Sequence, residues 1–361
     1  MGAVDGPVIL AIDGNSLVHR SFHAQARTGV HTADGRPCWA VRGLLMQLVA
    51  AVDRIRPTAV VVGFDDPDAS LRRERWPGYK ATRVDKLDSL VEQLACAVEV
   101  LTRLGLAVVV PSGLEADDVL ASTAATARAA GGETVIVTSD RDSFSLIDDA
   151  TSVLRIINGG VEASPLLTPE RLMLLLGVRP DQYRDFAALR GDPSDNLPGV
   201  RGIGPRTAAA LLAKFGTARA AFDDLEAVAE AHGPGVARRM AEPGAREAWQ
   251  LNCQVMTMHA DLALPHDLVN GAGVLPLPAD TVDDVFRAHD LTWSITDALR
   301  VLANVEPANP TPPRTITSPW GNPSHAGDPW DRHIAPRPRR ESTRPRPQPT
   351  RPRVEQLALF D

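Results

Sequence analysis

The sequence predicts an α/β fold with a parallel, doubly wound sheet, followed by a helical region and a disordered C-terminal tail. Short apolar runs alternate with helical patterns over the first half of the chain, an arrangement typical of parallel sheets. The runs that predict strands are 8–13, 59–65, 106–111 and 134–140. Acidic residues stand at or shortly after the carboxyl ends of these runs, which is the edge where such sheets bind ligands.

Helical periodicity predicts the elements between these strands. One helix pattern begins at Ser16, a second covers 39–55 and a third covers 87–104. The connection at 66–86 is basic and nearly without pattern, which predicts an exposed loop or short helices.

The second half of the chain changes from strands to helices. Runs 152–158 and 161–167, separated by two glycines, predict a hairpin that extends the sheet. A helix-rich region follows from Pro169 to about Ala303. From Glu306 to Arg353 Pro and Arg dominate, which predicts a disordered or polyproline-type linker.

Composition limits the class of protein. A length of 361 residues predicts two folded units plus extra segments. The three cysteines lie far apart without ligand spacing, which predicts reduced thiols and no zinc site. With neither a signal peptide nor a membrane-length apolar run, cytoplasmic location is expected.

The net charge of −7 is unevenly distributed along the chain. After Glu306 nine Arg oppose five acids, so the tail is +4 and the rest of the chain is −11. An acidic body still binds nucleic acid if its acids are concentrated in one metal-filled site.

Clustered acids are the main chemical signal. Like charges held close together cost stability, and a multivalent cation removes that cost. Hard oxygen ligands select Mg²⁺ or Mn²⁺, and the number of acids suits two ions. The alternative is that they are helix caps and solvated surface acids. The nine candidate metal ligands are Asp13, Asp65, Glu115, Asp117, Asp118, Asp140, Asp142, Asp192 and Asp195.

A glycine-rich segment at 199–208 predicts a helix-hairpin-helix that binds a nucleic-acid backbone without reading sequence. Glycines permit a tight turn, and exposed amides at the start of the following helix can hold a phosphate. The alternative is an ordinary turn between helices. The residues expected to contact DNA here are Gly199, Gly202, Gly204, Arg206 and Thr207.

The basic segment at 71–83 has a second binding pattern. Basic side chains interleaved with one aromatic suit a phosphate clamp beside a stacking surface. The alternative is a solvated basic loop. The candidate DNA-binding residues are Arg72, Tyr79, Lys80 and Arg83.

Taken together, these motifs resemble the 5′-nuclease family, which comprises the 5′→3′ exonuclease domain of bacterial family A DNA polymerases and the flap endonucleases. The resemblance covers about residues 7–300. The matching blocks begin at Asp13-Gly14, Arg20-Ser-Phe-His-Ala24, Phe64-Asp65, Arg72-x-Glu74, Gly78-Tyr79-Lys80-Ala81, Glu115-Ala-Asp117-Asp118, Thr138-Ser-Asp140-Arg-Asp142 and Gly191-Asp192-x-Ser-Asp195.

The resemblance implies a PIN-like nuclease core at 1–180 with a helical arch at about 66–90, and a helix-hairpin-helix region at 181–305. It implies that all nine acids are metal-site acids, with Asp13, Asp117 and Asp140 catalytic beside Lys80. It also implies DNA contacts by Arg20, by Tyr79 and by Lys80 at the scissile phosphate, and a K⁺ ion at the hairpin.

Three departures from the family pattern stand out. His19 occupies a position where bacterial relatives commonly have Tyr, and Arg206 replaces the usual Lys. No polymerase sequence follows, so a stand-alone nuclease, expected as a monomer near the nucleoid, is the interpretation.

The end of the tail, 354–361, resembles the bacterial sliding-clamp-binding peptide. Gln supplies a polar anchor, and Leu and Phe fill an apolar pocket. The alternatives are a terminal helix docking on its own domain or a fortuitous apolar end. The residues expected to bind the clamp are Gln356, Leu357, Leu359 and Phe360.

The leading hypothesis is therefore a structure-specific 5′ nuclease that uses two Mg²⁺ or Mn²⁺ ions in RNA-primer removal and DNA repair. Its expected substrates are 5′ flaps, nicks and RNA-primed ends. Two alternatives remain open: a non-catalytic flap-binding scaffold, and a PIN-type ribonuclease that shares the sheet and a smaller acid set.

Overall fold

The computed structural model describes residues 6–32, 35–83, 86–264, 267–268 and 270–306. These residues belong to one unit of the chain. The predicted linker beyond Glu306 and the predicted clamp-binding peptide at 354–361 lie outside the described residues.

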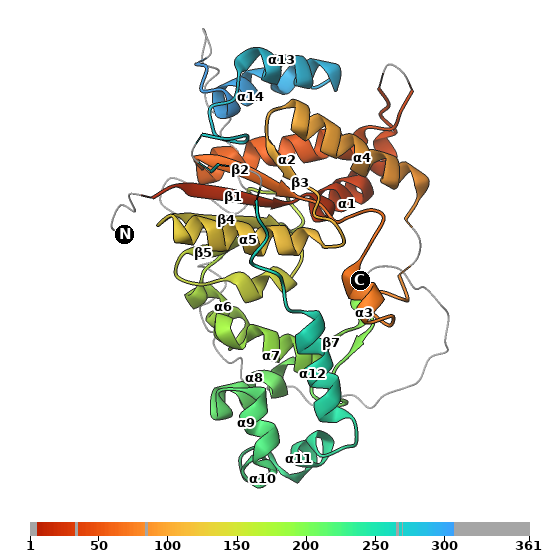
Figure 1. The fold of residues 1–361 in the computed structure, drawn as a ribbon, viewed down its shortest axis with the longest axis vertical. Coiled ribbons are helices and arrows are strands. Elements are labelled where there is room, and N and C mark those ends of the chain that lie inside the picture. The colour runs from red at the N-terminus through yellow and green to blue at the C-terminus, as the bar shows by residue number, and fades with distance from the viewer. Residues whose placement is uncertain (1–5, 33–34, 84–85, 265–266, 269, 307–361) are drawn as a thin grey trace, which may run out of the picture. The chain divides into compact units, whose positions relative to one another are not determined.

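A six-stranded sheet with the order β3-β2-β1-β4-β5-β6 forms the centre of the fold (Figure 1). Its first five strands are parallel, and β6 runs antiparallel to β5. The parallel, doubly wound prediction is thus confirmed. The strands are β1 (Val8–Asp13), β2 (Ala59–Gly63), β3 (Ala107–Val109), β4 (Glu133–Thr138), β5 (Thr151–Arg155) and β6 (Leu166–Leu167).

Both faces of the sheet are buried, which explains why the strands are continuously apolar. In β1, Leu10 and Ile12 face one core, whereas Ile9 and Ala11 face the opposite side. Helices α1 (Gly14–Gln25), α2 (Trp39–Ile55) and α4 (Asp88–Arg103) cover the first face. Helix α5 (Ala116–Ala129) covers the second face.

The predicted arch at about 66–90 contains one short helix, α3 (Leu71–Arg75), followed by turns up to residue 83. Ser70 caps α3 by accepting a hydrogen bond from the Arg73 amide. The prediction of a loop or short helices is confirmed for the described part of this segment.

The helices after the sheet share its second core. Tyr183 and Phe186 of the helical region pack in the same cluster as Ala11 and Ile136 of the strands. A two-stranded hairpin, β7 (Gly191–Asp192) and β8 (Leu197–Pro198), interrupts this region. The helices are α6 (Pro169–Leu176), α7 (Pro180–Arg190), α8 (Pro205–Phe215), α9 (Ala218–Asp223), α10 (Leu225–His232), α11 (Pro234–Met240) and α12 (Ala245–Val255).

The last two helices, α13 (Ala279–Ala288) and α14 (Ile295–Leu302), return to the opposite side of the sheet. Phe286 and Leu302 are fully buried in the core that contains Leu44 of α2. The segment predicted as one helical region at 181–305 is therefore divided between the two faces of the sheet. None of the described helices is long and apolar enough to cross a membrane.

Candidate active site

A cleft of about 1120 Å³ opens at the carboxyl ends of the parallel strands. Acids and bases line it together, so the expected convergence of strand-end carboxylates is present. The acids that line it are Asp13, Asp65, Glu115, Asp117, Asp140 and Asp192, and the Lys and Arg residues are Arg20, Lys80, Arg83, Lys86, Arg141 and Arg190.

Asp13 ends β1 and is held in a fixed orientation. One carboxylate oxygen accepts a hydrogen bond from the Ser16 amide at 2.9 Å, which caps α1. The other accepts from the Thr138 hydroxyl at 2.7 Å, and the same hydroxyl accepts from the Asp140 amide at 2.9 Å. Thr138 therefore connects Asp13 at the end of β1 with Asp140 just after β4.

Asp65 follows β2 and is held from two sides. The Asn15 amide group donates to one carboxylate oxygen at 2.9 Å. The Ala116 backbone N–H, at the N-terminus of α5, donates to the other at 3.0 Å. The positive end of the α5 dipole thus faces this carboxylate.

Asp117 on α5 and Asp142, which follows β4, extend the acidic group. The Ser143 hydroxyl contacts Asp117 at 3.4 Å, and the Asp142 amide donates to Asp140 at 3.1 Å. Glu115, Asp117 and Asp142 also line a small adjoining pocket, together with Asp195. The structure thus brings eight of the nine predicted acids to two neighbouring hollows.

Four of these acids, Asp13, Asp117, Asp142 and Asp195, carry raised pKa values, and burial is the largest cause for each. Burial, together with the charges of Asp65 and Asp140, raises the pKa of Asp13 to about 7. Burial also raises the pKa of Asp142 to about 8, with Asp140 as the next cause. The pKa of Asp117 is raised for the same two reasons.

This donor set fits a hard divalent cation. Buried carboxylates that repel one another are costly when ionised, and a cation removes that cost. Within the described residues no three carboxylate, imidazole or thiol groups already converge closely enough to ligate one ion. The ligand arrangement for an ion is therefore not preformed among these residues.

The raised pKa values predict that the metal-free protein loses stability as the pH rises. The unfolded carboxylates ionise near pH 3.8, before the folded ones at about 7 and 8. The folded state thus holds more protons across this window, and the free energy of unfolding falls with pH. In EDTA, we expect the Tm to fall by a few degrees between about pH 6.5 and 8.5.

Differential scanning calorimetry of the metal-free protein measures this slope. Asp142→Asn should flatten it, because the substituted side chain does not titrate. Added Mg²⁺ should raise the Tm more at the upper pH than at the lower one. A slope that is equal in the wild type and the variant would contradict the assignment.

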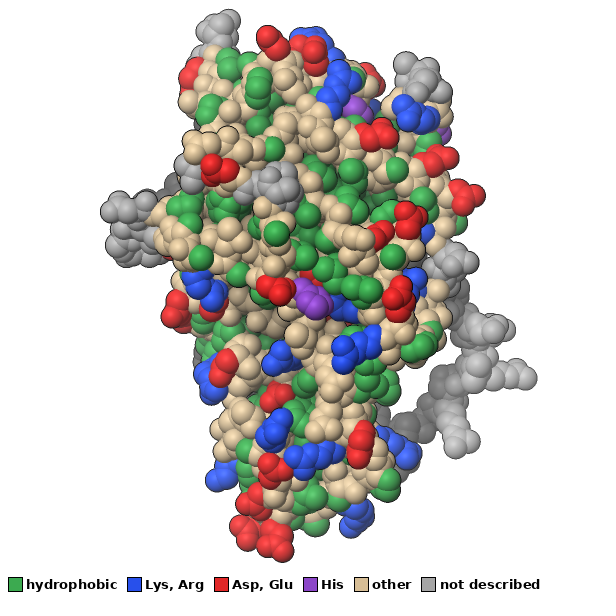
Figure 2. Space-filling model, viewed as in Figure 1, with side chains coloured by type: hydrophobic (Ala, Val, Ile, Leu, Met, Phe, Trp, Pro, Cys, Tyr) green, Lys and Arg blue, Asp and Glu red, His purple; other side chains and the backbone are tan. Residues whose placement is uncertain are grey.

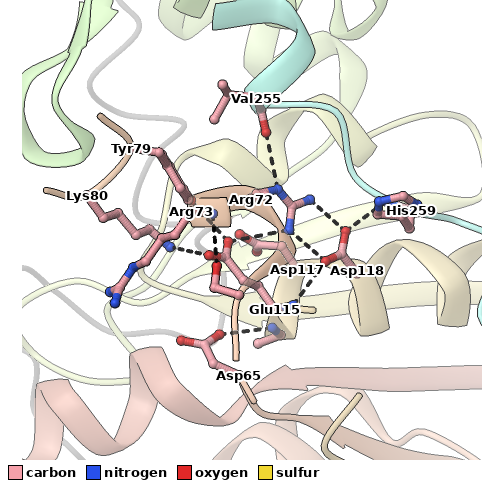
Figure 3. A network of polar contacts seen from close by, with 12 residues as sticks. Asp65, Arg72, Arg73, Tyr79, Lys80, Glu115, Asp117, Asp118, Val255 and His259 are labelled. Carbon is pink, nitrogen blue, oxygen red and sulfur yellow. Dashed lines mark hydrogen bonds and ion pairs between the residues drawn. The ribbon is translucent and has the colours of Figure 1, made fainter. Parts of the chain in front are cut away.

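Glu115 lies at the centre of a polar network (Figure 3). Lys80 donates to one of its carboxylate oxygens at 3.0 Å, and the Tyr79 hydroxyl donates to the other at 3.0 Å. The Tyr79 side chain is only 7% exposed, so its ring is packed rather than presented as the expected stacking surface. Burial pushes the Lys80 pKa down, but Glu115 and Asp195 outweigh this and leave that pKa raised.

Asp118 and Arg72 differ from their predicted roles. Asp118 is fully buried, and both of its oxygens accept hydrogen bonds from Arg72 at 2.7 Å. Burial raises the Asp118 pKa, but Arg72 outweighs this and leaves it lowered. Arg72 is 6% exposed and has no free face for DNA. The structure thus does not place Asp118 with the other acids, and it replaces the expected DNA contact of Arg72 with a buried ion pair.

Asp192 and Asp195 belong to the β7–β8 hairpin. Asp192 accepts hydrogen bonds from the amide and hydroxyl of Ser194 at 2.8 and 2.6 Å. Asp195 forms an ion pair with Arg83, whose side chain is partly exposed at the cleft. The Asp195 carbonyl accepts from the Lys80 amide at 2.9 Å, so this hairpin holds the basic segment in place.

The glycine-rich segment forms a tight turn before α8. Gly202 has φ +76°, the left-handed region that favours glycine. A Cβ on Gly199 would lie 2.3 Å from the Arg190 carbonyl, so only glycine fits there. Gly204 and Arg206 are exposed at the start of α8, which leaves its first amides accessible.

Sequence reasoning missed several residues of the cleft. Asn15, Ser16 and Thr138 orient acids, and Ser16 Oγ lies 2.5 Å from Ser139 Oγ. Their positions next to Asp13 and Asp140 in the sequence are the signal that could have found them. Arg141, Arg190 and Lys86 also line the cleft. The predicted Arg20 lines it too, and donates to Asn158 at 3.0 Å.

His19 lines the same cleft, and burial lowers its pKa to about 4. Nearby Lys86 contributes to this lowering. The imidazole is therefore neutral at neutral pH, which makes it a flat, uncharged surface at the cleft wall.

Two family profiles match the chain. A profile described as "5'-3' exonuclease, N-terminal resolvase-like domain" matches residues 8–173. A profile described as "5'-3' exonuclease, C-terminal SAM fold" matches residues 178–273. The two lie in succession and together cover most of the chain.

Curated relatives include bacterial DNA polymerases. DNA polymerase I of Mycobacterium bovis is 39% identical over 222 residues, which is 62% of this chain and 24% of that protein. The thermostable DNA polymerase I of Thermus aquaticus is 38% identical over 272 residues, which is 75% of this chain and 29% of that protein. The chain thus matches 24% and 29% of the length of these two relatives.

Solved structures share the fold. The 5′-exonuclease of bacteriophage T5, in a structure with bound zinc, has a TM-score of 0.57 and 16% identity, covering 82% of this chain and 99% of that one. The catalytic core of Rad2 in complex with DNA substrate has a TM-score of 0.51 and 15% identity, covering 83% and 92%. With the profiles matching in succession over most of its length, the chain belongs to the 5′→3′ exonuclease family.

Proposed function

We propose that this protein is a divalent-metal-dependent 5′ nuclease that hydrolyses DNA phosphodiesters as a 5′→3′ exonuclease and 5′-flap endonuclease. The observation that carries the proposal is the cleft at the sheet edge, where mutually repelling carboxylates face Lys and Arg side chains. Such a site attracts a divalent cation and a phosphate at once.

Eight acids would hold the metal, which we propose to be two Mg²⁺ or Mn²⁺ ions. When bound, the ions would supply an activated water and charge stabilisation at the leaving oxygen. We leave Asp118 out of this set because Arg72 and two backbone amides already fill its oxygens. The eight are Asp13, Asp65, Glu115, Asp117, Asp140, Asp142, Asp192 and Asp195.

Lys80 and Arg83 would hold the scissile strand. Both line the cleft together with Asp13 and Asp140, and both are paired with carboxylates. Lys80 Nζ, 3.0 Å from Glu115, can place a positive charge on a phosphate that enters beside that acid. Arg83 can bind the adjacent phosphate through the two forked N–H donors of its guanidinium group.

The turn at 199–207 would grip the duplex. The exposed N-terminus of α8 can bind a phosphate of the DNA backbone through its N–H groups, and Arg206 adds a positive charge there. A K⁺ ion bound by backbone carbonyls of the turn belongs to the same proposal. Lys and Arg side chains also occur over the helical half of the face shown in Figure 2, mixed with acids.

The relatives support DNA as the substrate. The two relatives described above are named DNA polymerase I, and the Rad2 structure contains a DNA substrate. We propose that this protein acts on 5′ flaps, nicks and RNA-primed ends in replication and repair.

End-labelled substrates test the proposal directly. We expect Mg²⁺-dependent release of short 5′ products from a 5′-flap duplex and from a nicked duplex, and no products in EDTA. Cleavage of single-stranded RNA with no action on flaps would favour a PIN-type ribonuclease. Tight flap binding without any hydrolysis would favour a non-catalytic scaffold.

The C-terminal peptide at 354–361 supports a proposal about the partner. Its Gln, Leu and Phe residues suit an apolar pocket, and the Pro/Arg-rich sequence before it suits a tether. Deleting 354–361 should abolish capture by an immobilised bacterial sliding clamp and leave turnover on free flaps within about twofold. Capture that survives the deletion would contradict the proposal. Leu357→Ala/Phe360→Ala in the full chain is the matched variant.

A further inference from the structure

Arg72 is a buried cation on α3, 6% exposed, and it contacts two other segments of the chain (Figure 3). Its two terminal nitrogens each donate to Asp118 on α5 at 2.7 Å, and one also lies 3.5 Å from Glu115. Its Nε donates to the Val255 carbonyl at 3.2 Å, and Nη2 donates to the Thr257 carbonyl at 3.0 Å.

Asp118 completes the connection from the other side. One oxygen accepts from the Glu115 backbone N–H at 3.0 Å, which fixes the residue that Lys80 and Tyr79 contact. The other oxygen accepts from the His259 backbone N–H at 2.8 Å. The ion pair therefore joins the basic segment, the N-terminus of α5 and the chain that leaves α12.

That exit chain leads back to the turn at 199–207. Asn252 of α12 is fully buried and donates to the Pro198 carbonyl at 2.9 Å and to the Ala188 carbonyl at 3.0 Å. Pro198 immediately precedes Gly199. A continuous set of hydrogen bonds, buried or partly buried, thus runs from Glu115 through Arg72 and α12 to the glycine-rich turn.

We propose that Arg72 is a positioning residue that fixes the distance between the cleft acids and the turn at 199–207, and so selects the phosphodiester that is cut. The inference rests on the proposed function, in which the turn holds the duplex. The planar, forked guanidinium serves four acceptors at once, which an ammonium cannot do. Asp118 is then the counter-ion of Arg72 and a capping residue of α5, and not a metal ligand.

The test compares Arg72→Lys with Arg73→Lys, because Arg73 lies next to it on α3 but is exposed. On an end-labelled 5′-flap duplex we expect Arg72→Lys to lower kcat about 10–100-fold, the range seen when supporting contacts of a metal site are lost. We expect KM to stay within about threefold and products to spread over neighbouring phosphodiesters. Arg73→Lys should give wild-type kcat and a wild-type product.

A paired variant separates positioning from stability. Arg72→Met/Asp118→Leu removes the ions but fills the space, and buried pairs replaced in this way often keep their stability. We expect it to remain folded at the assay temperature, with a Tm lowered by the loss of partners for the Glu115 and His259 amides, and to cut imprecisely. Wild-type kcat and a single product from Arg72→Lys or from the paired variant would overturn the inference. The paired variant alone decides the matter if Arg72→Lys does not fold.

Amide hydrogen exchange tests the positioning role of Arg72 without depending on whether the protein is a nuclease. Absence of cleavage by the wild-type protein would refute the nuclease proposal alone. The inference would then be decided by exchange at 115–118 and 255–262 in the paired variant, which should be faster than in the wild type. Unchanged exchange in these two segments would overturn the positioning role of Arg72.

Discussion

Asp117→Asn should lower turnover on a 5′-flap duplex by on the order of 10²–10³-fold or more, while flap affinity in EDTA stays within about twofold. Asp117 stands at the start of α5, beside Asp13 and Asp140, whose charges raise its pKa together with burial. The amide keeps the size of the side chain but removes a charged oxygen that a divalent cation would need.

The same substitution should stabilise the metal-free protein. Removing one of several mutually repelling carboxylates relieves their repulsion, so the Tm in EDTA should rise rather than fall. Reduced turnover together with a raised Tm excludes misfolding as the cause. Single-turnover cleavage, anisotropy binding and calorimetry measure the three quantities.

The matched control is Asp68→Asn, since Asp68 is exposed and does not line the cleft. It makes the same chemical change and should leave turnover unaltered. Full turnover by Asp117→Asn would remove this residue from the proposed metal site, and equal losses in both variants would point to net charge instead.

The convergence of Asp13, Asp65 and Asp140 could be predicted because parallel strands end at one edge of a sheet. Each acid follows an apolar run, and the register Asp13–Gly63 places the ends of β1 and β2 side by side. Strand periodicity and order in the chain carry this information locally. No knowledge of distant contacts was needed.

The role of Asp118 could not be read in the same way. Glu115 and Asp118 are three residues apart at a helix start, which predicts one shared face. The structure turns Asp118 instead toward Arg72, 46 residues earlier in the sequence. Such long-range pairing depends on how α3 packs, and the nearly patternless 66–86 segment gives no local signal for it.

The return of α13 and α14 to the sheet has the same origin. Both helices are strongly amphipathic, which predicts that each buries one face but not against which partner. Phe286 of α13 and Leu302 of α14 cover the apolar side of α2 and α4 that the sheet does not bury. Arg300 then closes the contact with a two-point ion pair to Asp53 on α2.

Lys80→Met should lower kcat on flap substrates by on the order of 10²–10³-fold and change KM by less than about threefold. Lys80 is closer to Glu115 than Arg72 is, at 3.0 Å against 3.5 Å, and its raised pKa keeps it charged at neutral pH. Methionine retains the unbranched stem but cannot place a charge on the scissile phosphate. The loss should therefore appear in the chemical step.

Lys86→Met is the control, because Lys86 also lines the cleft and the substitution removes the same charge. We expect it to weaken flap affinity slightly and to leave single-turnover rates within about threefold. In Lys80→Met, Glu115 also loses its nearest ammonium, so Mn²⁺ affinity measured by calorimetry should rise while cleavage falls. A general loss of electrostatic attraction would lower flap affinity and cleavage rate in both variants. A fall in cleavage together with a rise in Mn²⁺ affinity, seen in Lys80→Met alone, therefore identifies Lys80 as the group that acts on the phosphate.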